Sequence, residues 1–91
     1  MRDIKADLVE LLRESGSAHH QAYIATNGED PDWPIWYAGY LRDQINNLMG
    51  IGLTTTRYVV LLVELERART SMDPAPDWPT YYAEQMMARY R

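Results

Sequence analysis

The sequence predicts an all-α fold, a four-helix bundle made of two helix–turn–helix hairpins within a single domain, residues 1–91. Three observations predict it. Apolar residues recur every three or four positions, which is the period of an amphipathic helix. Glycine, asparagine and proline residues divide the chain into four such segments. The block Pro31–Ala38 returns 45 residues later, at 76–83, with six of eight residues unchanged. Each hairpin therefore enters its second helix through the same Pro-Asp-Trp-Pro motif.

The first helix is expected over residues 3–26. The phase of its apolar stripe continues across Gly16, so we expect one helix, straight or kinked, that tolerates this glycine at about 1 kcal/mol. The alternative is a break at that point and a restart with Ser17 as the cap. Asn27 and Gly28 both tolerate left-handed backbone and form a stop signal. The stripe consists of Ile4, Leu8, Leu11, Leu12, Ser15, Ala18, Ala22 and Thr26.

The second helix is expected over residues 33–48. Asp32 is expected to cap it by accepting backbone N–H bonds, and Pro34 suits the first turn, where its missing N–H costs nothing. Gly50 and Gly52 end the helix. At 100° per residue, one face carries Trp33, Tyr37, Tyr40, Leu41, Gln44 and Leu48, with Trp36 and Ile45 beside it.

The third helix is expected to reach about Ser71 after a threonine cap at position 54, 55 or 56. Its first part, Tyr58–Val63, is apolar all round, so a buried β-strand is the competing interpretation. Two oppositely charged pairs at i,i+3 spacing favour the helix, namely Glu64 with Arg67 and Glu66 with Arg69.

The fourth helix follows a stiff, proline-rich linker at 73–76. Asp77, Trp78 and Pro79 repeat the opening of the second helix, and the segment extends to about Tyr90. One face of this helix carries Trp78, Tyr82 and Met86.

The repeated block has a structural and a functional interpretation. Structurally, the aspartate caps, the second proline starts the helix, and the tyrosine four residues after the tryptophan shares its face. Functionally, the two aromatic clusters line a shared cleft for an aromatic, cationic or proline-rich ligand. The candidate binding residues are His19, Tyr23, Trp33, Trp36, Tyr37, Tyr40, Trp78 and Tyr82.

The longer form of the first block, Asp30–Leu41, reads DPDWPIWYAGYL. It resembles a segment of small, uncharacterised helical proteins of bacteria, over about residues 19–48. The resemblance implies a helical fold and brings no activity with it.

Composition excludes several classes of function. The chain has no cysteine, so it forms no disulfide or thiolate site, and a domain this small without disulfides is expected in the reducing cytoplasm. A net charge of −4 argues against nucleic acid as the main partner. The longest apolar run, Tyr58–Val63, is far shorter than the roughly 20 residues of a membrane span. Charges throughout residues 1–15 argue against a signal peptide. Lys5 is the single lysine beside many arginines, which favours a GC-rich bacterial genome.

Motifs for catalysis or metal binding are missing from the sequence. His19 and His20 diverge by 100° on a helix, so they cannot chelate one metal ion from the same face, and a site would need carboxylates such as Asp30 or Asp32. No serine lies in a Gly-x-Ser-x-Gly elbow, and Gly50-x-Gly52 lacks the lysine of a phosphate loop. We therefore expect no metal or cofactor.

The sequence favours a non-enzymatic cytoplasmic module for binding or assembly, acting as a homodimer or by docking on another, larger protein. Val60 and Val63 lie on the side of the third helix opposite Tyr58, Leu62 and Leu65, and exposed apolar faces usually mark interfaces. Met86, Met87 and Tyr90 add adaptable apolar surface. The alternative is a small-ligand site lined by tryptophan and tyrosine with His19 at its edge. A third option is a small enzyme that uses His19 or His20 as an acid–base, for example His19 with Asp32 or Tyr37.

Overall fold

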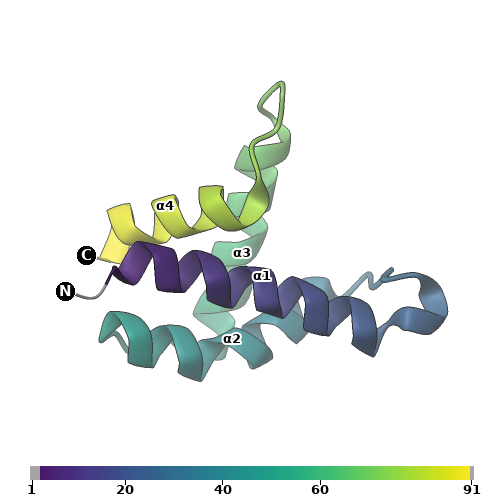
Figure 1. Cartoon of the computed structure of the whole chain (residues 1–91), viewed down its shortest axis with the longest axis horizontal. Coiled ribbons are helices and arrows are strands. Elements are labelled where there is room, and N and C mark those ends of the chain that lie inside the picture. Colours follow the sequence, from purple (N-terminus) through teal and green to yellow (C-terminus); the bar gives the residue numbers. More distant parts are fainter. Residues whose placement is uncertain (1–2, 91) are drawn as a thin grey trace.

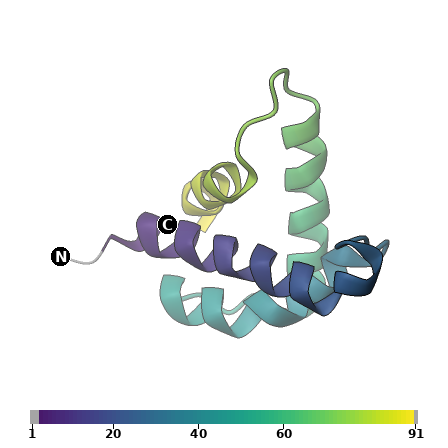
Figure 2. The ribbon, with the colours of Figure 1, turned by 45° about the vertical axis from the view of Figure 1, so that its right-hand side comes forward.

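A computed structural model describes residues 3–90 and confirms the all-α class. Its elements are α1 (Ile4–Ala22), the 3-10 turn η1 (Ile24–Thr26), α2 (Trp33–Met49), α3 (Thr55–Thr70) and α4 (Trp78–Tyr90), and the described residues include no strand. Both α2 and α4 run antiparallel to α1, one on each side of it (Figure 1). Helix α3 stands steeply across this layer and contacts α2 and α4 (Figure 2).

Helix α1 passes through Gly16 without a break, as predicted, but it ends at Ala22 and not at Thr26. Residues 24–26 tighten into η1, and Asn27 and Gly28 follow with positive φ angles of 57° and 86°. The Thr26 hydroxyl donates to carbonyl oxygens on both sides of this turn, which satisfies groups that a longer helix would have paired itself.

Gly16 leaves room for a close tertiary contact. A Cβ at this position would lie 3.0 Å from Cζ2 of Trp78, so the ring of the second motif occupies the space that any side chain would need. The glycine that weakens α1 locally therefore lets α4 approach it.

The two motifs begin their helices differently. Asp32 occupies the N-cap position of α2, but its side chain accepts no capping hydrogen bond, so that prediction is wrong. Asp77 does cap α4: its Oδ2 accepts from the backbone N–H of Thr80 at 3.3 Å and from the Thr80 hydroxyl at 2.8 Å. These Thr80 bonds are the main reason that the pKa of Asp77 lies below its ordinary value. Ile35 stands at the matching position of the first motif and has no hydroxyl to hold an aspartate.

The buried face of α2 also differs from the predicted one. The helix buries Ala38, Leu41, Ile45 and Met49, whereas Tyr40 and Gln44 of the predicted face are exposed. Aliphatic side chains allow close helix packing, while rings with polar atoms stay where those atoms reach water or a partner.

Helix α3 is capped by Thr54, whose hydroxyl oxygen accepts from the Arg57 N–H at 3.2 Å. It buries Tyr58, Leu61, Leu62 and Leu65, as the helical interpretation requires. Of the two predicted ion pairs, Glu66–Arg69 forms. Glu64 instead accepts from Arg89 of α4 at 3.2 Å.

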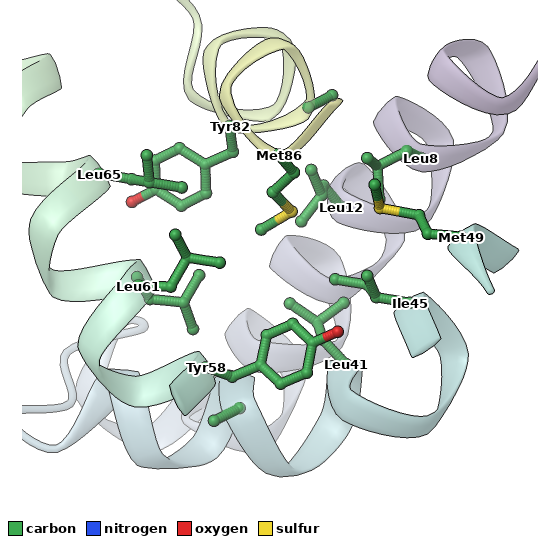
Figure 3. Packing of buried hydrophobic residues seen from close by; sticks show 13 residues of the cluster. Leu8, Leu12, Leu41, Ile45, Met49, Tyr58, Leu61, Leu65, Tyr82 and Met86 are labelled. Carbon is green, nitrogen blue, oxygen red and sulfur yellow. The ribbon is translucent and has the colours of Figure 1, made fainter. Parts of the chain in front are cut away.

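All four helices contribute to one apolar core (Figure 3). Leu12 of α1 lies beside Met86 of α4 and Leu8 beside Met49 of α2, while Leu65 of α3 lies next to Tyr82 of α4. No helix among residues 3–90 combines the length and the apolar character that crossing a membrane requires.

Candidate functional site

The two motif copies meet at one pocket of about 300 Å³, to which we refer as the paired-motif pocket. All four helices and the turn before α2 contribute to its walls. Its aromatic lining consists of Trp33, Tyr37, Trp78 and Tyr82. Its polar lining consists of His19, Asp30, Glu66 and Arg69, and Gly28 and Leu62 complete it.

The aromatic side chains form a continuous series of crossed rings. Trp33 lies 6.1 Å from Tyr37 at an interplanar angle of 75°, and Trp78 lies 6.0 Å from the same tyrosine at 74°. Trp78 in turn lies 5.3 Å from Tyr82 at 67°. In each motif the tryptophan meets the tyrosine four residues later on the same helix face, and Tyr37 joins the two motifs.

His19 lies among the aromatic side chains of the first motif. Its ring is stacked between Tyr23 and Tyr37, each with its centroid 4.8 Å away, and Trp36 meets it edge-on at 4.9 Å. Its Nε2 lies 3.0 Å from Oδ2 of Asp30, and both side chains are more than nine-tenths buried.

Asp30 is held as a carboxylate. Its hydrogen bond with His19 is the main reason that its pKa lies below the ordinary value, and its Oδ1 also accepts the backbone N–H of Asp32 at 3.0 Å. An ionised carboxylate only accepts hydrogen bonds, so Nε2 of His19 carries a proton. Burial, together with the Asp30 charge, raises the pKa of Tyr37, so this ring remains a neutral phenol.

A second charged network lines the pocket from α3. Arg69 donates from Nε and Nη2 to the two oxygens of Glu66, both at 2.8 Å, and from Nη1 to the Pro76 carbonyl oxygen at 3.0 Å. The Tyr82 hydroxyl donates to Oε1 of Glu66 at 2.8 Å. The Arg69 bonds contribute most to keeping the pKa of Glu66 below its ordinary value. The network joins α3 to both the entry and the first turns of α4.

The structure distributes the eight predicted binding residues over three positions. His19, Trp33, Tyr37, Trp78 and Tyr82 line the pocket. Tyr23 and Trp36 lie behind it and contact the His19 ring. Tyr40 stacks on Trp36, away from the pocket lining, and is 36% exposed.

Sequence reasoning missed two parts of the site. The Glu66–Arg69 pair was visible as an i,i+3 spacing, but nothing local indicated that it faces an aromatic pocket. The sequence suggests Asp30 as a possible metal ligand and Asp32 as a possible partner of His19. In the structure, Asp30 itself pairs with His19. His20 is exposed. Among residues 3–90, no three histidine or carboxylate side chains gather in a way that would hold a metal ion.

Comparison of the chain with models of protein families, with curated proteins and with solved structures yields no match. The resemblance of residues 30–41 to bacterial proteins thus stays a prediction, and the geometry of the pocket is the basis for assigning a function.

Proposed function

We propose that this protein binds a small ligand in the paired-motif pocket. The observation that carries the proposal is the meeting of the two motifs: Tyr37 of the first lies against Trp78 of the second, and their aromatic side chains line the same pocket. A capping residue and a proline in the first turn favour the start of a helix on their own, and neither requires that the two tryptophans share a pocket.

The dimensions and preorganisation of the pocket support this proposal. Its volume lies at the lower end of the roughly 300–1,000 Å³ that is usual for small-molecule sites. Aromatic walls with a few placed polar groups are the usual lining of such sites. Asp30 and Glu66 are already held by hydrogen bonds, so a ligand meets side chains that need little ordering.

The contacts of His19 support ligand binding in preference to catalysis by this residue. Its Nε2 is engaged by Asp30, and both faces of its ring are covered by tyrosines. The cytoplasmic setting expected from the absence of cysteine belongs to the same proposal.

The three tryptophans provide a direct test. In a ¹⁵N-labelled sample each indole N–H gives its own NMR signal, and a small-fragment library can be screened against all three. We expect hits that shift the Trp33 and Trp78 signals more than the Trp36 signal, because only the first two line the pocket. A library without hits, or hits that shift Trp36 alone, would contradict the proposal.

A pair of variants makes the test specific. Trp33→Leu removes a half-buried ring from the pocket, and Tyr81→Leu removes a half-buried ring outside its lining. We expect the first variant to lose the binding of the fragment hits and the second to retain it, with circular dichroism confirming that both are folded.

Self-association is a second candidate, favoured by the outer face of α3. Val60 is 40% exposed and Val63 is half-buried, whereas the opposite face of this helix is in the core. The partner we propose is a second copy of the chain. Light scattering after size-exclusion chromatography at high micromolar concentration tests it: a dimer that dissociates in Val60→Lys supports the proposal, and a monomeric unmodified chain contradicts it.

A further inference from the structure

The charges around the paired-motif pocket do not balance. Two carboxylates, Asp30 and Glu66, line it, against one guanidinium, that of Arg69. Both carboxyl groups have lowered pKa values and are ionised at neutral pH. At a pH at which imidazole is neutral, the lining therefore carries one net negative charge.

Each nitrogen of the positive group in the lining already donates a hydrogen bond within the protein. Arg69 directs Nε and both Nη atoms at Glu66 and at the Pro76 carbonyl. Its charge is neutralised by Glu66 in a bidentate pair, which leaves little attraction for an anionic ligand. Asp30, by contrast, is held by an imidazole N–H, one backbone N–H and the Tyr23 hydroxyl, and none of these partners is a guanidinium or an ammonium group.

The aromatic side chains that line the pocket also attract positive charge. Trp33 and Trp78 both stand nearly perpendicular to Tyr37, so three rings form adjacent, crossed walls. The face of an aromatic ring carries negative charge density and attracts a cation, most strongly for tryptophan. Cages of aromatic rings recognise quaternary ammonium groups, and in this pocket the Asp30 carboxylate lines the same space as the rings.

From this arrangement we infer that the paired-motif pocket selects a small organic cation, an alkylammonium group, over neutral and anionic molecules of the same shape. The inference rests on the proposed function and specifies its ligand class. Desolvation of a charged group disfavours its binding in an ordinary apolar pocket, and the Asp30 carboxylate with the indole faces offsets that cost here.

Three probes of nearly equal shape test the inference: choline, its neutral carbon isostere dimethylbutanol, and the anion dimethylbutanoate. Titrations of the unmodified chain at constant ionic strength and about pH 8.5, two units above an ordinary imidazole pKa of about 6.5, follow the indole signals. We expect choline to bind about tenfold or more tightly than the neutral isostere, and the anion to bind most weakly.

Matched variants assign the selectivity to the pocket. Asp30→Asn removes the charge and keeps the shape, and we expect it to weaken choline binding about fivefold or more while leaving dimethylbutanol unchanged. Asp32→Asn removes an exposed charge two residues away, outside the lining, and should change choline affinity less than twofold. Both are compared after their near-ultraviolet circular dichroism matches that of the parent.

The outcomes separate this inference from the function it specifies. Equal affinity for the three probes, or preference for the neutral or anionic one, overturns the cation inference and leaves ligand binding intact. Absence of binding by choline overturns it as well, and the fragment screen then decides ligand binding alone. Because the probe comparison uses the unmodified chain, it holds even where Asp30→Asn does not fold.

Discussion

Removing one hydroxyl from Tyr82 tests whether the charged network joins α3 to α4. Tyr82 is 3% exposed and donates to Oε1 of Glu66 at 2.8 Å. A hydrogen bond to a charged group contributes about 1.5–3 kcal/mol. The Glu66 side chain is 31% exposed and keeps its Arg69 bonds, so water can replace the lost donor and the lower limit applies. We therefore expect Tyr82→Phe to lower the free energy of unfolding by about 1.5 kcal/mol.

Urea unfolding followed by circular dichroism measures this loss, and heating should show a decrease in Tm of roughly 6–12 °C. Tyr81→Phe is the matched control. Its ring is half-buried in the same helix, and its hydroxyl makes no hydrogen bond within the described chain, so it should lose less than about 0.5 kcal/mol.

The pH dependence provides an independent check on Tyr82. The folded-state pKa of Glu66 is lowered from 4.5, so its bonds stabilise the fold at neutral pH and lose that contribution as the pH falls through the lowered value. The difference in the free energy of unfolding between the parent and Tyr82→Phe should therefore stay constant above the ordinary value of 4.5 and narrow as the pH falls below it. Equal losses in the two phenylalanine variants, or a difference that does not depend on pH, would refute the reasoning.

Three further predictions concern the core, the cap and the contact between α1 and α4. Leu12→Ala, at a fully buried position, should cost about 2–5 kcal/mol in urea unfolding, and Leu11→Ala, at a half-buried one, clearly less. Asp77→Ala should destabilise the fold more than Asp32→Ala at neutral pH, because only Asp77 caps its helix; since the pKa of Asp77 is lowered, this difference should disappear in acid. Gly16→Leu should displace the Trp78 ring, seen as a changed near-ultraviolet spectrum and a loss of about 1–3 kcal/mol; an unchanged spectrum would contradict the proposed contact.

Helix positions could be predicted because adjacent residues decide them. The fourth helix occurs where it was expected, over Trp78–Tyr90, and Gly50 ends α2 with a left-handed backbone. Thr54 caps α3 as one of three predicted candidates. Each of these features depends on groups within about one helical turn, which are present in the sequence whatever the rest of the chain does.

The buried faces of helices and the partners of charged side chains were predicted less well, because both depend on how the helices pack. The α2 helix has apolar side chains on more than one side, so periodicity alone placed its core face on the aromatic residues. Glu64 has a suitable arginine three residues away on its own helix, yet it pairs with Arg89, which α4 brings alongside α3.

The sequence by itself determined the helical class, the four segments and the presence of two equivalent motifs. The tertiary structure alone decided that these motifs share one pocket, that His19 pairs with Asp30, and that Glu66 and Arg69 face the aromatic side chains. The reason is physical. A helix forms from interactions between near neighbours, whereas the distance between Tyr37 and Trp78 is determined by many packing contacts spread over four helices. Local patterns in a single sequence do not specify those contacts between helices.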